Sequence, residues 1–135
     1  MALDTTGLQL ELSILIKLIC GRTRAGKTTY SQQFDNVIHL DYCGGLTTCY
    51  NNVLNKVSKM SEDVVVEGIY NTAERRKSLL EAYKGDGEKI CIWIDTPLDV
   101  IKKRLFIQLP STAFNFEPPT LNEGWDSITI INNNY

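Results

Sequence analysis

The segment Gly21-Arg-Thr-Arg-Ala-Gly-Lys-Thr28 decides the fold, because it matches the pattern G-x-x-x-x-G-K-[ST] at every fixed position. It follows an apolar, strand-like run at residues 13–20 and precedes a helical pattern at residues 27–34. Its two glycines, Gly21 and Gly26, let the backbone curl, so that several N–H groups and the positive end of the helix face one phosphate chain. We therefore expect a phosphate-binding loop. The alternative is a glycine-containing turn with a surface lysine.

Two side chains of this loop are expected to carry its chemistry. Lys27 would reach the β- and γ-phosphates of a nucleotide, and the hydroxyl of Thr28 would hold Mg²⁺. The residues expected to contact the nucleotide are Gly21, Arg22, Arg24, Ala25, Gly26, Lys27, Thr28 and Thr29.

Short β-branched runs alternate with longer helical patterns along the chain. The alternation is the signal for β-α-β units and a parallel sheet with both faces covered. Strands are expected at residues 13–20, 36–40, 63–67, 89–94 and 127–131, and helices at 27–34, 46–60, 73–84 and 97–105. The sequence therefore predicts an α/β fold of three layers around a five-stranded parallel sheet.

The composition is that of one ordinary globular domain. The chain has 135 residues, 43% of them hydrophobic, and its 14 basic and 16 acidic residues leave a net charge of -2. A net charge of this sign does not favour binding to nucleic acid or to an anionic membrane. The apolar stretch from residue 8 to 20 is interrupted by Glu11 and Lys17, which argues against a membrane helix and a signal peptide. We expect one cytoplasmic domain spanning residues 1–135.

Two carboxylates follow or end predicted strands, at the sheet edge where ligands of open α/β sheets collect. Asp41 closes the second strand and could act as general base toward an attacking hydroxyl; the alternative is a turn aspartate before Gly44-Gly45. Glu67 ends the third strand, and with Thr28 it is expected to serve Mg²⁺; a capping role is the alternative. Both carboxylates are also expected to border the acceptor substrate.

Two arginines begin the third predicted helix. An arginine is mildly unfavourable at that end of a helix dipole, so Arg75 and Arg76 invite a functional explanation. Guanidinium groups bind phosphate oxygens in pairs, and we expect these two to grip an anionic substrate. A solvated helix face is the alternative.

A lid is expected at about residues 106–120, because three prolines make residues 109–120 a poor helix or strand. The chain has no lysine or arginine from residue 105 to 135, so this lid cannot supply a cation to the transferred phosphoryl group. Arg104, at the end of the fourth helix, is the expected source of that charge, and Arg22 or Arg24 are the alternatives.

Five elements together give the chain a wider resemblance. They are the loop Gly21–Thr28, Asp41-Tyr42, Val64-Val-Val-Glu-Gly68, Asn71-Thr-Ala-Glu-Arg-Arg76 and Phe116-Glu-Pro-Pro-Thr-Leu-Asn-Glu-Gly-Trp-Asp-Ser-Ile128. With them the chain resembles the polynucleotide-kinase-like P-loop kinases after about residue 14. The resemblance implies the P-loop NTPase fold, ATP and Mg²⁺, and transfer of the γ-phosphate to a hydroxyl, often the 5′-hydroxyl of a nucleic acid. It also implies that Asp41 is the base.

The chain departs from that family on the acceptor side. The family often carries an arginine just after the aspartate, where this chain has Cys43, and one or more arginines in the lid. We therefore expect a kinase with Lys27, Asp41 and Arg104 as its catalytic residues and a polynucleotide end, a nucleoside or nucleotide, or a small metabolite as acceptor. The alternative is an ATP-binding module with little transfer activity.

Overall fold

The computed structural model describes residues 14–40, 47–104 and 115–133. Its helices and strands alternate along the chain as the sequence predicts. They are β1 (Ile16–Cys20), α2 (Lys27–Ser31), β2 (Ile38–His39), α3 (Thr47–Ser58), β3 (Val64–Glu67), α4 (Ala73–Ala82), β4 (Lys89–Asp95), α5 (Leu98–Arg104), the short 3₁₀-helix η2 (Leu121–Glu123) and β5 (Ser127–Asn132).

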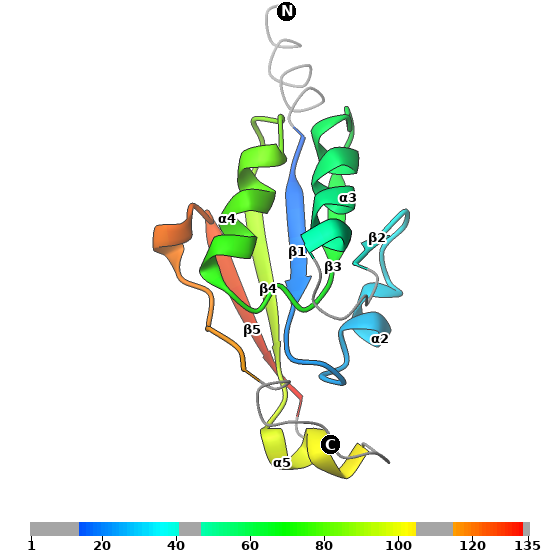
Figure 1. Ribbon diagram of the computed structural model, residues 1–135, viewed down its shortest axis with the longest axis vertical. Helices are drawn as coiled ribbons and strands as arrows, with labels where there is room; N and C mark the ends of the chain where they lie inside the picture. Colours follow the sequence, from blue (N-terminus) through cyan, green and yellow to red (C-terminus); the bar gives the residue numbers. More distant parts are fainter. Residues whose placement is uncertain (1–13, 41–46, 105–114, 134–135) are drawn as a thin grey trace, which may run out of the picture.

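The five strands form one parallel sheet in the order β2-β3-β1-β4-β5 (Figure 1). The predicted α/β fold with a five-stranded parallel sheet is therefore confirmed. β1 is the central strand, and it pairs with β3 on one side and β4 on the other. The loop after β1 consequently opens at the carboxyl ends of three adjacent strands.

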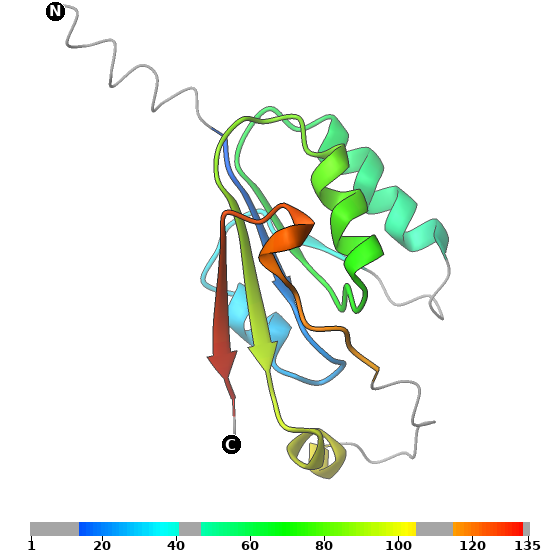
Figure 2. The ribbon, with the colours of Figure 1, turned by 90° about the vertical axis from the view of Figure 1, so that its left-hand side faces the viewer.

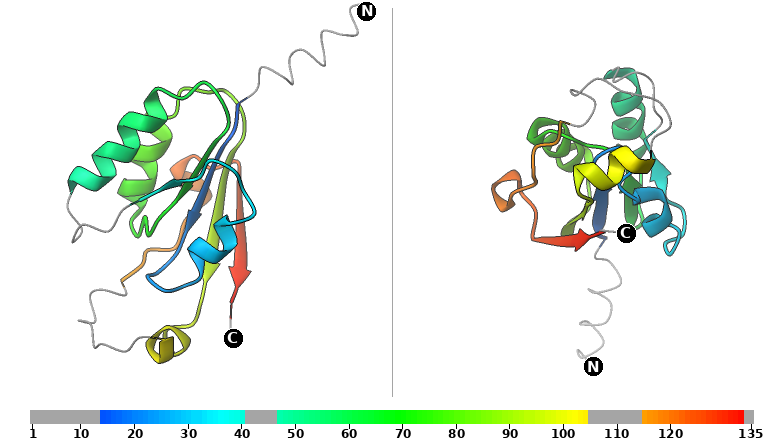
Figure 3. Two further views of the ribbon diagram at one scale, coloured as in Figure 1. Left: turned by 90° about the vertical axis from the view of Figure 1, so that its right-hand side faces the viewer. Right: turned by 90° about the horizontal axis from the view of Figure 1, so that it is seen from below.

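Both faces of the sheet carry a hydrophobic core, because side chains alternate between the faces along each strand. Leu18 packs with residues of α3 and α4, whereas Ile19 packs with residues of α2 and the segment after it. Figures 2 and 3 show α3 and α4 side by side on one face and the short α2 on the other. α5 lies beyond the carboxyl end of β4 (Figure 1).

A charged residue in the central strand has an aromatic partner. Lys17 lies on the face that α2 covers, and its Nζ stands 4.5 Å from the centre of the Phe34 ring. The ring face attracts the ammonium group, so the half-buried lysine has a favourable contact in the core between the sheet and α2.

The ends of several elements differ from the sequence prediction. α4 is capped by Thr72, because the Thr72 side chain accepts a hydrogen bond from the N–H of Arg75 at 3.2 Å. This helix ends at Ala82, short of the expected Lys84, since Tyr83 adopts an extended backbone. Toward the other end of the chain, β5 continues to Asn132, one residue beyond the strand expected at 127–131.

In the described part of the chain, no helix is both long and apolar enough to cross a membrane.

Candidate active site

The loop between β1 and α2 requires glycine at both ends. A Cβ atom on Gly21 would stand 2.6 Å from the carbonyl oxygen of Ile94, which is too close for any side chain. Gly26 has φ 109, and its Cβ would stand 2.6 Å from Nδ2 of Asn133. Gly21 is therefore explained by close packing against the backbone of β4, and Gly26 by a backbone conformation that favours glycine.

Several backbone donors of this loop are unpaired. The N–H of Ala25 donates to the carbonyl of Arg22 at 3.1 Å, which closes a turn inside the loop. By contrast, the N–H groups of Thr23, Gly26 and Lys27 find no acceptor within the described residues. Successive unpaired N–H groups in a curled backbone form a site suited to an anion.

Lys27 lies inside the loop rather than on the surface. Its side chain is buried, and Nζ donates to the carbonyl of Arg22 at 2.6 Å. Burial removes water from the ammonium group and lowers the pKa of Lys27 to about 8, although the nearby carboxylate of Glu67 opposes the shift. Burial of the Lys27 ammonium group therefore costs folding free energy, and the group belongs to the same loop as the unpaired N–H groups. The alternative of a surface lysine in a turn does not describe this residue.

Glu67 stands beside the loop because β3 pairs directly with β1. Its Oε1 lies 3.5 Å from Oγ1 of Thr28 and 2.6 Å from Nδ1 of His39, at the end of β2. The sequence predicts the closeness of Thr28 and Glu67, but it gave no role to His39. The imidazole contacts the same carboxylate oxygen that faces Thr28.

Thr28 and Glu67 fit a magnesium site. Mg²⁺ prefers oxygen ligands and usually takes only one or two from the protein, completing its shell with water and substrate phosphates. A hydroxyl and a carboxylate 3.5 Å apart supply such a donor pair. A larger cluster is not needed for this ion, and the described residues contain no group of three or more His, Cys, Asp or Glu arranged to hold a metal.

Two carbonyl groups of the loop accept hydrogen bonds from side chains at or near the ends of β4, β5 and α5. The carbonyl of Ala25 accepts from Oγ1 of Thr96 at 2.6 Å and from Nδ2 of Asn133 at 2.9 Å. The carbonyl of Arg24 accepts from Nη1 of Arg104 at 2.7 Å. Arg104, predicted from its place in the sequence, thus lies at the loop. Sequence reasoning missed Thr96 and Asn133, although Thr96 directly follows a buried strand at the correct sheet edge.

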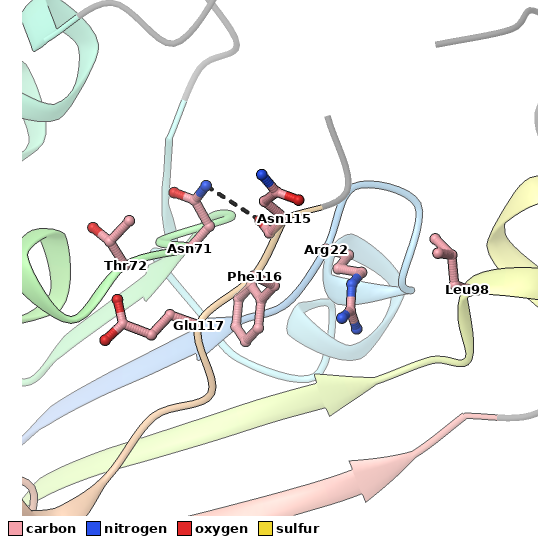
Figure 4. Close-up of a pocket in the computed structure, with 7 residues that line it drawn as sticks. All are labelled: Arg22, Asn71, Thr72, Leu98, Asn115, Phe116 and Glu117. Carbon is pink, nitrogen blue, oxygen red and sulfur yellow. Dashed lines mark hydrogen bonds between the residues drawn. The ribbon is translucent and has the colours of Figure 1, made fainter. Parts of the chain in front are cut away.

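A pocket of about 610 Å³ opens next to the loop. One loop residue lines it, together with residues from the β3–α4 connection, the start of α5 and the segment that returns from α5 to the sheet. They are Arg22, Asn71, Thr72, Leu98, Asn115, Phe116 and Glu117 (Figure 4).

One wall of the pocket is formed by the start of a hydrogen-bonded segment, residues 115–123, which we call the return segment. The N–H of Glu117 donates to the carbonyl of Asn71 at 2.8 Å, and Oε1 of Glu117 accepts from the N–H of Ala73 at 3.1 Å. Phe116 stacks on Trp93 of β4 with ring centres 5.6 Å apart. The guanidinium carbon of Arg22 stands 5.9 Å from the Phe116 ring, so a cation and an aromatic face border the same cavity.

The two arginines of α4 have different surroundings, although the sequence suggests one role for both. Arg75 stacks over the ring of Tyr50 in α3, with its guanidinium carbon 3.9 Å from the ring centre. Arg76 is completely buried, and its guanidinium group donates to both carboxylate oxygens of Glu123 and to the carbonyl of Tyr70. The expectation that Arg76 grips a substrate therefore does not fit its position, since the side chain is completely buried and each of its three nitrogens donates to a group inside the protein.

Glu123 is the acidic partner of that arginine. Burial alone would raise the pKa of its carboxyl group, but hydrogen bonds from Arg76 and Trp125 outweigh burial and hold the pKa below its usual range. The carboxylate also accepts from the N–H of Thr120 at 3.1 Å. The pair joins α4 to the end of the return segment.

Two predicted features lie outside the described residues. Asp41, the expected base, is one, and the part of the expected lid between residues 105 and 114 is the other. Residues 115–120 of that lid belong to the return segment.

Comparisons with known proteins reveal likeness in fold. No protein-family model matches the chain, and no curated protein matches it. Among solved structures it is similar to an unliganded sugar kinase from Janibacter sp. HTCC2649, with a TM-score of 0.63 and 13% identity over 89% of this chain and 85% of that one. It is also similar to the crystal structure of APE1195, with a TM-score of 0.62 and 11% identity over 87% of this chain and 85% of that one.

At these identities the comparisons bear on the fold alone. They agree with the predicted α/β architecture, and a kinase is among the proteins that share it. Neither structure is described as a polynucleotide kinase. The closer family resemblance therefore remains an expectation from sequence motifs.

Proposed function

We propose that this chain is an ATP-dependent phosphotransferase that binds the triphosphate in the loop Gly21–Thr28. One observation carries the proposal: unpaired loop N–H groups, the buried cation of Lys27 and the Thr28–Glu67 oxygen pair converge at the carboxyl ends of β1 and β3. Such a grouping of donors, a cation and hard oxygen ligands matches the needs of a triphosphate with its metal ion.

Each part of the loop has a role in this proposal. The N–H groups of Thr23, Gly26 and Lys27 would bind phosphate oxygens, and the Lys27 ammonium would leave the Arg22 carbonyl for a phosphate. Thr28 and Glu67 would hold Mg²⁺, which when bound neutralises charge on the phosphates. Phosphoryl transfer is catalysed mainly by such positioning and charge stabilisation.

The pocket beside Arg22 is the proposed place of the acceptor. Amide and hydroxyl groups of Asn71, Asn115 and Thr72 can hydrogen-bond a polyhydroxylated molecule, while the Phe116 ring offers a face to a sugar or a base. The acceptor classes that fit such a pocket are a nucleoside, a nucleotide, a nucleic acid end and a small metabolite. Asp41 remains the proposed base, and Arg104 the proposed source of charge near the transferred group.

Transfer of labelled phosphate tests the proposal. Purified protein is incubated with γ-labelled ATP, Mg²⁺ and separate 5′-hydroxyl oligonucleotides, nucleosides, nucleotides and sugars. We expect one acceptor class to become labelled by the wild type and by Lys56→Met, an exposed lysine on α3, but not by Lys27→Met. Labelling by Lys27→Met at the wild-type rate would reject the proposed role of the loop.

A second candidate, an ATP-binding module with little transfer activity, rests on a single feature of the sequence. From residue 105 to 135 the chain contains no lysine or arginine, so the segment expected to close over the nucleotide brings no cation to it. ATP binding without transfer to any acceptor of the panel would favour this candidate.

A further inference from the structure

One carbonyl group of the loop accepts hydrogen bonds from two side chains that are distant in sequence. The oxygen of Ala25 accepts from Oγ1 of Thr96 at 2.6 Å and from Nδ2 of Asn133 at 2.9 Å. Thr96 follows β4 and is 1% exposed, whereas Asn133 follows β5 and is half-buried. The ends of two strands therefore converge on a single peptide group.

The orientation of that carbonyl determines where the next N–H points. A trans peptide is planar, so its C=O and N–H groups point in opposite directions. None of the described peptide bonds is cis. With the Ala25 oxygen directed toward Thr96 and Asn133, the N–H of Gly26 must point to the opposite side, where it finds no acceptor within the described chain.

The peptide needs such support because of the residue that follows it. Gly26 has φ 109, a conformation that glycine adopts readily, and glycine also populates many others at little cost. Asn133 fills the space that a Cβ on Gly26 would need, since that atom would stand 2.6 Å from Nδ2. The same asparagine thus packs against Gly26 and holds the preceding carbonyl.

We propose that Thr96 and Asn133 are positioning residues for the nucleotide, because they fix the Ala25–Gly26 peptide with its N–H directed at a phosphate oxygen. The inference rests on the proposed function and adds a determinant of triphosphate affinity that touches neither the phosphate nor the metal. A donor that is fixed in advance binds more tightly, since less conformational freedom is lost on binding.

A matched pair of substitutions at Thr96 isolates the hydroxyl. Thr96→Val keeps the shape of the side chain and removes the donor, whereas Thr96→Ser keeps the donor and removes a methyl group. Loss of one such hydrogen bond should weaken binding of ATP about five- to tenfold in Thr96→Val, and Thr96→Ser should restore most of it. Asn133→Ala removes the second donor and should act in the same direction.

The probe that tests positioning is inorganic tripolyphosphate with Mg²⁺, measured by calorimetry beside ATP at a temperature where all variants are folded. If the peptide presents its N–H to phosphate, Thr96→Val and Asn133→Ala weaken the binding of tripolyphosphate and of ATP by the same factor. A purely structural role would lower the unfolding temperature and leave both affinities unchanged in the folded variants, which would overturn the inference.

The controls separate this inference from the proposed function. Wild-type protein that binds neither ATP nor tripolyphosphate would defeat both. Wild-type binding with unchanged affinities in Thr96→Val and Asn133→Ala would defeat the positioning role alone. If Thr96→Val does not fold, Asn133→Ala decides the question, because Asn133 is half-exposed near the end of β5 and contacts the same carbonyl.

Discussion

Arg76 of α4 and Glu123 of η2 form a bidentate ion pair in the protein interior, with Nε–Oε1 and Nη2–Oε2 distances of 2.7 and 3.0 Å. Their side chains are 0% and 2% exposed. Nη1 of the arginine donates to the carbonyl of Tyr70, and the indole N–H of Trp125 donates to the glutamate. The two hydrogen bonds between Arg76 and Glu123 thus join α4 to the return segment that forms the pocket wall.

Removing one partner of this pair should destabilise the fold strongly. Arg76→Met leaves the Glu123 carboxylate buried without its cation, and a broken buried pair costs about 3–5 kcal/mol. The free energy of unfolding, measured by urea titration, should fall by that amount. Arg75→Met, which changes the neighbouring half-buried arginine, is the matched control and should change it by less than about 1 kcal/mol. Equal losses in the two variants would show that the buried pair has no special structural role.

Replacing Lys27 should stabilise the protein in the absence of nucleotide. The pKa of Lys27 falls from 10.5 to about 8 on folding, so below pH 8 the fold bears the full cost of a buried ammonium group. At roughly 1.4 kcal/mol per pH unit, that shift sets an upper limit of about 3 kcal/mol. Lys27→Met should therefore unfold at a higher urea concentration than the wild type at pH 7.

The same substitution has a pH signature. Between pH 8 and 10.5 the unfolded chain binds more protons at Lys27 than the folded one, so this residue's cost fades as the pH rises. The stability difference between Lys27→Met and wild type should shrink over that range when unfolding is measured at each pH. A difference that stays constant from pH 7 to 10.5 would contradict the burial argument.

Glu67→Gln should raise the Mg²⁺ requirement of the reaction. The substitution keeps the shape of the side chain next to Thr28 and His39 but removes its charge, and losses of 10–100-fold in metal affinity or activity are typical for residues that support a metal site. The Mg²⁺ concentration for half-maximal turnover should rise at least about tenfold. Glu62→Gln, at an exposed position before β3, is the control. Equal Mg²⁺ dependence in both variants would remove Glu67 from the metal site.

Phe116→Ala should weaken binding of the acceptor and leave binding of the nucleotide unchanged. The ring lines the pocket and stacks on Trp93, away from the unpaired N–H groups of the loop. Loss of a stacking face costs about 0.5–1.5 kcal/mol, so the KM of the acceptor should rise up to about tenfold while the KM of ATP stays within twofold. Leu121→Ala, on the exposed face of η2, is the control. A rise in the KM of ATP alone would place the acceptor elsewhere.

The sequence predicts those parts of the molecule that depend on local pattern and strand order. The glycine and lysine spacing marks the loop, and the alternation of apolar runs gives the parallel sheet. Pairing of β1 with β3 then brings Glu67 to Thr28, as expected from the usual order in this fold.

The parts that sequence reasoning missed depend on contacts between distant residues. Arg76 looks like a substrate ligand at the start of a helix because its partner Glu123 is 47 residues away. Asn133 stands 108 residues from Ala25 in a polar chain end that resembles a frayed terminus. No local pattern distinguishes these side chains from solvated ones, since only the packed sheet brings them together.

The most direct test of the account is calorimetric titration of purified protein with ATP in the presence of Mg²⁺. We expect saturable binding by the wild type, similar binding by Lys56→Met and none by Lys27→Met. The absence of measurable affinity of the folded wild-type protein for any nucleoside triphosphate would contradict the claim that Gly21–Thr28 is a triphosphate-binding loop.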